Sequence, residues 1–301
     1  MSPDLATLLA TSPALRRQLV GIEKVAGVLA PVLLLGEAGS GRSTLARALH
    51  RAGGRPQGPL VEVDCGAIPP DLFDSELFGY RAGAFTGAVS DSPGRLGRAA
   101  GGTLVLDRVE SLPQSVQPKL LRVVAEGVFS RLGGEEQAAD VRFVAIGGSD
   151  LPRRVEGGAF RSDLYYRLAV VSYEVPPLRD RRDEIPHLAE ALLADLAIRL
   201  GRSPDIDLDR QALSWMTGHP WPGNLTELRN VLERSLVVNT SGSVLAPEAP
   251  ASARPRSLAE VEKEEILRAL AHTRGHQGRA AEMLGISRKA LWEKRRRHGI
   301  P

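Results

Sequence analysis

A short apolar run leads directly into a glycine-rich loop, and this junction constrains the fold more than any other part of the 301-residue chain. The run covers 32–35, and the loop reads Gly36-Glu37-Ala38-Gly39-Ser40-Gly41-Arg42-Ser43-Thr44. A helical pattern follows from about Ser43 to His50. In a strand–loop–helix unit, glycines let backbone N–H groups face an anion, and the helix N-terminus adds partial positive charge. The junction therefore predicts a phosphate-binding P-loop.

Short apolar runs recur along the first 176 residues, with helical stretches between them. The five runs are Val32–Leu35, Leu60–Asp64, Thr103–Asp107, Val141–Ile146 and Val170–Val175. Nearly continuous apolar runs separated by helices are typical of a buried parallel sheet. Before the first run, Ser12 and Pro13 predict a helix start, and this helix is expected to reach about Gly27. We therefore predict an α/β core with a parallel sheet over 1–176.

Beyond residue 176 the strand pattern stops and helical spacing takes over. The spacing predicts helices over 183–200 and from Asn224 to about Val238, with Asn224 and Glu227 as a variant of the capping box. A stretch rich in Ser, Ala and Pro over 241–256 has no periodicity and predicts a linker. We expect a helical lid over 177–240, then this linker, then an all-α domain over 257–301.

The predicted phosphate site departs from the usual pattern at two positions. The motif G-x-x-x-x-G-K-[ST] holds except that Arg42, a planar and bulkier cation, replaces the Lys that reaches the β- and γ-phosphates. Asp107 ends a strand and is a candidate Mg²⁺ ligand, directly or through water. Arg108 follows it, where ring ATPases normally carry a Glu that polarises the attacking water. A guanidinium cannot accept a proton from that water, so this change affects hydrolysis more directly than binding.

Positive charge is concentrated near the C-terminus. Residues 254–301 contain 12 Lys/Arg and 6 Asp/Glu, although the whole chain has a net charge of only +3. This asymmetry favours nucleic acid as the partner of that segment, and a solvated basic face is the alternative.

The same segment has the pattern of a helix-turn-helix. Ser257 and Glu260 predict a capped first helix, a second helix is expected over 277–284, and Gly285-Ile286-Ser287 predicts a tight turn with a new helix cap. The third helix, over 288–298, is rich in Lys and Arg and fits a recognition helix for double-stranded DNA. The side chains that we expect to contact DNA are Ser287, Arg288, Lys289, Trp292, Lys294, Arg296 and Arg297.

Membrane and secretory classes are not favoured. The chain has no apolar run approaching the roughly 20 residues that span a bilayer, and no signal-peptide pattern at its start. The single cysteine, Cys65, has no partner for an internal disulfide and is expected to be a small buried hydrophobe. We therefore expect a cytoplasmic protein, which associates with the bacterial nucleoid when bound to DNA.

With these motifs in place, the chain resembles the sigma-54-dependent activators, the NtrC-type members of the AAA+ ATPases, from about residue 12 to residue 301. The most specific match is Gly83-Ala84-Phe85-Thr86-Gly87-Ala88, the loop that in this family grips the sigma-54 polymerase. Further matches lie at 160–168, 177–182 and 221–224. The C-terminal segment is similar to the Fis-type helix-turn-helix of the same family. The resemblance implies an AAA+ core with a lid, ATP with Mg²⁺ as cofactor, and a ring, expected to be a hexamer.

The resemblance also implies roles for particular residues. In the family, arginines at the positions of Arg161 and Arg167 act as fingers that reach the nucleotide of the neighbouring subunit; structural salt bridges at the interface are the alternative. Residues 36–44 and Asp107 would hold the nucleotide and its metal ion.

The departures from the family cluster at the subunit's own ATP site. Besides the two arginines already named, Gly148 replaces a sensor Asn, Thr226 replaces a sensor Arg of the lid, and Asp64 replaces an Asn. Since a carboxylate appears where the cation of Arg108 would need one, we expect Asp64 and Arg108 to form a salt bridge.

Two functional interpretations follow. The chemistry favours a sequence-specific DNA-binding regulator with impaired ATP hydrolysis, acting as a dimer on DNA, a uniform ring or one subunit type of a mixed ring. The alternative is a fully active ATPase that remodels the closed complex of sigma-54 RNA polymerase. The sequence leaves open whether the chain is an enzyme.

Overall fold

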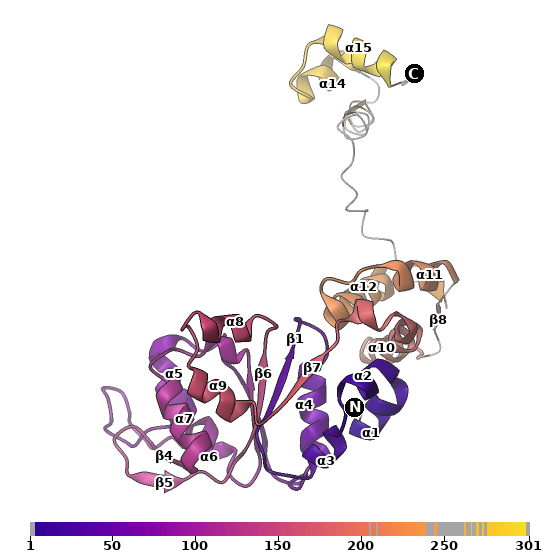
Figure 1. Ribbon diagram of the computed structural model, residues 1–301. Coiled ribbons are helices and arrows are strands. Elements are labelled where there is room, and N and C mark those ends of the chain that lie inside the picture. The colour runs from indigo at the N-terminus through magenta and orange to yellow at the C-terminus, as the bar shows by residue number, and fades with distance from the viewer. Residues whose placement is uncertain are drawn as a thin grey trace. The chain divides into compact units, whose positions relative to one another are not determined.

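The computed structural model describes residues 4–204, 206–208, 210–238, 244–245, 262, 266, 269–270, 273 and 276–298. Two compact units are present, Met1–Pro247 and Glu248–Pro301 (Figure 1). Most of the linker predicted over 241–256, and the helix start predicted from Ser257 and Glu260, lie outside the described residues. The domain boundaries inferred from the sequence stay predictions.

A five-stranded parallel sheet forms the centre of the first unit, with strand order β2-β3-β6-β1-β7. The strands are β1 (Val32–Gly36), β2 (Leu60–Asp64), β3 (Thr103–Asp107), β6 (Arg142–Gly147) and β7 (Val171–Val175). In the register, Asp64 lies opposite Asp107, and Asp107 lies opposite Ile146. All five predicted strands are therefore confirmed, and with them the α/β fold class. Because every strand is parallel, their carboxyl ends share the edge that carries the P-loop.

Helices cover both faces of this sheet. They are α1 (Leu5–Thr11), α2 (Pro13–Gln18), α3 (Ile22–Ala26), α4 (Arg42–Arg51), α5 (Pro70–Phe78), α6 (Gly94–Arg98), α7 (Gln117–Glu126), α8 (Leu151–Glu156) and α9 (Ser162–Leu168). Alternation along β6 shows the two layers, since Phe143 packs in one buried cluster and Val144 in the other. The cluster of Phe143 includes side chains of α5, α7 and α9, and that of Val144 includes side chains of α1 to α4.

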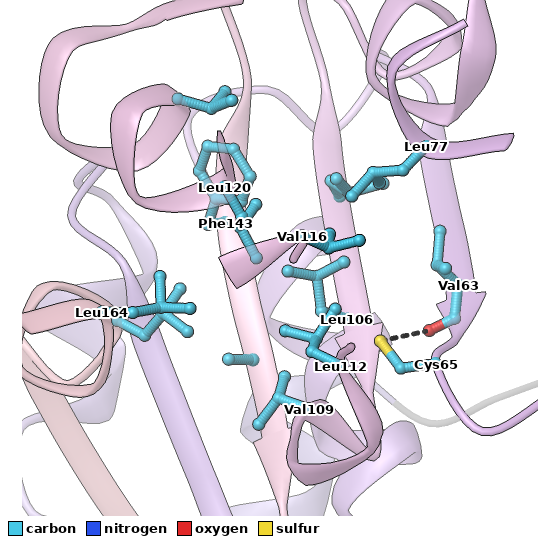
Figure 2. Packing of buried hydrophobic residues seen from close by; sticks show 14 of the residues in the cluster. Val63, Cys65, Leu77, Leu106, Val109, Leu112, Val116, Leu120, Phe143 and Leu164 are labelled. Carbon is cyan, nitrogen blue, oxygen red and sulfur yellow. Dashed lines mark hydrogen bonds between the residues drawn. The ribbon is translucent and has the colours of Figure 1, made fainter. Parts of the chain in front are cut away.

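Figure 2 shows the first of these clusters from close by. Leu106 and Phe143 come from two strands and Leu164 from α9, and Val63 and Cys65 lie at the β2 side. Cys65 is 2% exposed, and burial raises the pKa of its thiol. The prediction that this cysteine is a buried hydrophobe is confirmed.

The N-terminal helix differs from its prediction. Ser12 does cap α2, because its Oγ accepts a hydrogen bond from Leu15 N at 3.1 Å. The helix then ends at Gln18, and α3 begins at Ile22, so the prediction of one continuous helix to about Gly27 was wrong. Gly21 interrupts it with φ of +78°, a left-handed conformation that a helix interior does not contain.

The sequence patterns did not predict several short strands. Strands β4 (Val128–Ser130) and β5 (Glu136–Ala138) form an antiparallel pair, and β8 (Asp207–Leu208) pairs with β9 (Val244–Leu245). Runs of two or three residues are too short to show a period of two.

A helical lid completes the first unit. Two 3₁₀ turns, η2 (Leu178–Asp180) and η3 (Arg182–Glu184), lead into α10 (Ile185–Arg199), α11 (Arg210–Gly218) and α12 (Asn224–Val238). Its buried cluster surrounds Trp221, which is fully buried. No helix among the described residues is long and apolar enough to cross a membrane.

The second unit contains α14 (Gln277–Met283) and α15 (Arg288–Arg297). Gly285 takes φ of +66°, and Ser287 Oγ caps α15 by accepting from Ala290 N at 3.2 Å. Leu291 is 1% exposed and packs in a buried cluster with Ala280 and Ala281. The predicted turn and recognition helix are thus present in the structure.

Candidate nucleotide site and nucleic-acid interface

The P-loop backbone requires its glycines. Gly39 and Gly41 have φ of +75° and +105°. A Cβ on Gly36 would lie 2.7 Å from the carbonyl oxygen of Val175, and one on Gly39 would lie 2.5 Å from that of Gly223. Helix α4 begins at Arg42, directly after Gly41, so its N-terminal N–H groups and positive dipole end face the space above the loop. This local geometry fits the phosphates of a nucleotide.

The predicted metal ligand also lies at this edge. Ser43 Oγ donates to Asp107 Oδ2 at 3.3 Å, which brings the first turn of α4 to the end of β3. A hydroxyl and a carboxylate are hard oxygen ligands of the kind that Mg²⁺ prefers. The residues present therefore fit a phosphate chain with Mg²⁺, held by the loop over 36–44, Ser43 and Asp107.

Arg42 is bonded to the protein, whereas the cation at this position of a P-loop usually reaches the β- and γ-phosphates. Its guanidinium donates to the carbonyl oxygen of Gly147, at the end of β6. Burial lowers the pKa of Arg42, and the negative charges of Asp107 and Glu110 oppose that effect. The cation is thus already engaged by the protein at the strand ends.

Arg108 and Asp64 form the expected salt bridge. Arg108 Nε lies 2.6 Å from Asp64 Oδ1, and its Nη2 contacts the other carboxylate oxygen. Both side chains are 48% exposed. Hydrogen bonding from Arg108 lowers the pKa of Asp64, and that bond in turn raises the pKa of Arg108. The hypothesis from charge complementarity is confirmed, and this carboxylate is committed to a cation.

A second acidic residue enters the site without having been predicted. Glu110 lies in the 3₁₀ turn η1 (Val109–Ser111), and its Oε2 accepts a hydrogen bond from Gly148 N at 3.3 Å. A Cβ on Gly148 would lie 3.4 Å from Glu110 Oε1 and 2.5 Å from Asp150 Oδ1. A signal was available, because Glu110 is an acidic residue only three positions after Asp107.

The lid closes onto the P-loop through Asn224, which is fully buried. Its Oδ1 accepts from Leu178 N at 2.7 Å, and its Nδ2 donates to Ala38 O at 3.0 Å and Glu37 Oε2 at 3.2 Å. The predicted capping box of Asn224 and Glu227 is therefore wrong in its pairing. Glu227 Oε2 instead accepts from Gly223 N at 2.8 Å, and the side chain of Asn224 bonds to Leu178 and the P-loop rather than to the first turn of α12.

Two arginines strengthen this closure. Arg179 makes two hydrogen bonds to Glu37, at 2.6 and 2.8 Å, which lower the pKa of Glu37 to about 2. Arg181, 4% exposed, donates to Ser40 O at 2.9 Å. Thr226, at the position of the missing sensor arginine, lies against Gly39. The lid thus contacts the P-loop through neutral side chains, Asn224 and Thr226, and through the ion pair of Arg179 with Glu37.

The candidate finger arginines lie on and beside α9, at the surface. Arg161 makes two hydrogen bonds to Asp163, at 2.7 and 3.0 Å, and Arg167 donates to Ala125 O at 2.8 Å. Tyr166 between them is 72% exposed. Arg161 thus lies at the N-terminal end of α9, and Tyr166 and Arg167 lie in its last turn. Their role towards a second subunit stays a prediction.

The hexapeptide loop over 83–88 lies between α5 and α6. Gly83 N donates to Ala88 O at 2.8 Å, which closes the loop on itself. Phe85 is 44% exposed, and its ring packs edge-on against Tyr80, with 4.9 Å between centroids. An exposed aromatic on a closed loop is suited to contact with a partner.

On α15, most of the predicted DNA-contacting side chains are exposed. Trp292 is 53% exposed, and the guanidinium of Arg296 lies 5.7 Å from its ring centroid. Lys294 differs, because it pairs with Glu262, which also contacts His298 Nε2 at 2.8 Å. These two contacts, His298 first, lower the pKa of Glu262 to about 2. The exposed residues of the predicted set are Ser287, Arg288, Lys289, Trp292, Arg296 and Arg297.

Comparison with known proteins gives three family matches along the chain. A family described as "Sigma-54 interaction domain" matches residues 8–174, "AAA+ ATPase lid domain" matches 179–265, and "Bacterial regulatory protein, Fis family" matches 257–298.

Individual relatives agree with these matches. The regulatory protein AtoC of Escherichia coli is 40% identical over 97% of the chain, which covers 68% of that relative. The Nif-specific regulatory protein of Azotobacter vinelandii is 39% identical over 93% of the chain, which spans 56% of its length. A crystal structure of NtrX from Brucella abortus in complex with ATP is 32% identical, with a TM-score of 0.71, over 99% of this chain and 69% of that one.

Proposed function

The chain belongs to the sigma-54-dependent transcriptional regulators, and from this premise we propose that it is a DNA-binding regulator whose own ATP hydrolysis is impaired. It recognises double-stranded DNA through α15 and contacts sigma-54 RNA polymerase through the loop over 83–88. Nucleotide with Mg²⁺ binds at the P-loop and Asp107.

One observation carries the proposal of impaired hydrolysis. Arg108 occupies the position of the water-polarising Glu, and its guanidinium is bound to the carboxylate of Asp64 at 2.6 Å. A guanidinium has only donors, so it cannot orient water as an acceptor or take its proton. Arg42, bound to Gly147 O, is likewise drawn away from a phosphate chain.

The distribution of changed and retained residues supports a mixed ring. The residues changed in this chain serve its own nucleotide, whereas the exposed Arg161 and Arg167 would serve the nucleotide of a neighbour. A subunit that keeps the fingers and loses its own catalytic groups is suited to donate fingers to an intact paralogue. The structure of NtrX in complex with ATP supports nucleotide binding in a related chain.

The proposal is tested by phosphate release from Mg-ATP, measured over a wide range of protein concentration because ring assembly depends on concentration. The comparison is an Arg42→Lys/Arg108→Glu double variant. A silent wild type, whether or not the variant gains activity, is the expected result. Concentration-dependent turnover by the wild type would refute the proposal and identify a working ATPase activator.

Mixed-ring assembly has its own test. The tagged chain is used to pull down partners from cells with and without an intact AAA+ paralogue. The ATPase activity of the paralogue is then measured with the wild type and with an Arg161→Ala/Arg167→Ala variant. We expect the wild type to stimulate the ATPase activity of the paralogue and the variant to bind without stimulating it. Equal stimulation by both chains would show that these arginines are not fingers.

A further inference from the structure

Glu110 places a carboxylate next to the engaged cation of the P-loop. Its Oε2 accepts a hydrogen bond from Gly148 N at 3.3 Å, and Arg42 donates to the carbonyl of the preceding residue, Gly147. Acid and guanidinium are therefore anchored to consecutive residues at the end of β6. The negative charges of Asp107 and Glu110 both favour the charged form of Arg42 against its burial.

The position of Glu110 along the sheet edge relates it to the metal-binding end of the site. Asp107 lies opposite Ile146 in the register of β3 and β6, so Gly148 lies just beyond the strand end on the neighbouring strand. In P-loop proteins the metal ion bridges β- and γ-phosphate oxygens. A third phosphate held through Asp107 would therefore lie towards the end of β6, where Glu110 bonds to Gly148 N.

The absence of a side chain on Gly148 is part of the same arrangement. A Cβ there would lie 3.4 Å from Glu110 Oε1 and 2.5 Å from Asp150 Oδ1. A larger residue would displace Asp150, whereas its Cβ would lie at ordinary contact distance from Glu110, whose partner is the backbone N–H of this position. The neutral amide expected of a sensor Asn is thus replaced by a negative charge.

We propose that Glu110 makes this site select nucleoside diphosphates over triphosphates. The inference rests on the nucleotide-binding part of the proposed function. A third phosphate adds negative charge near the carboxylate, where partial burial limits screening by solvent. The charge of Arg42, which is bonded to Gly147 O, is already shared between Asp107 and Glu110 and therefore offsets less of this added charge. The first two phosphates would lie in the backbone cradle of the loop, whereas the hydrogen bond of Glu110 is to Gly148 N at the end of β6.

The test is equilibrium binding of fluorescent ADP and a fluorescent, non-hydrolysable ATP analogue to the full chain with Mg²⁺, read by anisotropy. Variants are Glu110→Gln and, as a matched loss of one charge in the β4–β5 turn, Glu135→Gln. We expect wild type and the Glu135 variant to bind the diphosphate about tenfold more tightly than the triphosphate. In Glu110→Gln, triphosphate affinity should rise about fivefold or more, with less than about a twofold change for the diphosphate.

Glu110→Ala serves as a second variant, and thermal melting by circular dichroism checks that each variant is folded. An unchanged ratio of the two affinities in folded Glu110 variants overturns the inference, as does a wild type that binds neither nucleotide. Hydrolysis does not enter the measurement. A wild type that hydrolyses ATP would refute the proposed function, while a shifted affinity ratio would still support the role of Glu110.

Discussion

Replacing Asn224 by Ala should destabilise the first unit by about 3 kcal/mol. The substitution leaves the N–H of Leu178 buried without its acceptor, at about 1–3 kcal/mol, and removes the donor to Ala38 O, at about 1 kcal/mol. Asn224 also has φ of +53°, a left-handed conformation that costs Ala about 1 kcal/mol. Some relaxation of the lid offsets part of this sum.

The assay is urea unfolding followed by tryptophan emission, since Trp221 is fully buried and its ring centroid lies 5.5 Å from that of Trp215. With an m-value of about 3 kcal/mol/M, the midpoint should fall by about 1 M. Asn224→Gly is the matched control, because it removes the same hydrogen bonds but accepts positive φ, so its shift should be smaller. A midpoint change below about 0.3 M for the Ala variant would refute the argument that this side chain holds the lid to the P-loop.

Three further outcomes are expected. The pKa of Glu37 is lowered from 4.5 to about 2, so the ionised carboxylate contributes fully to stability above pH 4.5, and this contribution is lost as the pH falls towards 2. Glu37→Gln should therefore flatten the pH dependence of the urea midpoint between these two pH values. Arg108→Glu places two carboxylates together and should lower the free energy of unfolding by about 0.5–1 kcal/mol, which thermal melting reports as a lower melting temperature. Adding Asp64→Asn should restore most of this loss; no recovery would contradict the pairing. In DNA-binding titrations, Arg288→Ala should relax sequence preference, whereas Arg297→Ala should lower affinity and the salt dependence on every sequence; equal effects from both changes would contradict this division.

Local patterns in the sequence were sufficient for the fold. The central strands β3, β6 and β1 are mostly apolar runs that are buried on both faces, so hydrophobicity marks them, whereas the edge strands β2 and β7 each expose a glutamate. The P-loop is likewise local, because its glycines are required by the backbone of nine consecutive residues. The break in the N-terminal helix was missed because the apolar spacing continues across Gly21. The positive φ of Gly21 ends the helical geometry there.

Part of the site could also be inferred from chemistry without coordinates. Asp64 and Arg108 are both departures from the family and have opposite charge, and this alone predicted their salt bridge. The structure then shows the pair, with Asp64 opposite Asp107 in the register. Complementary substitution of this kind requires no knowledge of side-chain direction. It predicts contact because opposite charges attract each other at short distance.

What only the tertiary structure decided is the direction of side chains whose partners are distant in the chain. Asn224 meets Glu37 across 187 residues, Arg42 meets Gly147 across 105, and Glu110 meets Gly148 across 38. Helical or strand periodicity reports which face of an element is buried, but it does not report which polar group lies opposite. That depends on how the lid docks and how the strand ends align. The sequence therefore determined the sheet, the P-loop and one ion pair, and packing determined where the remaining charges of the site point.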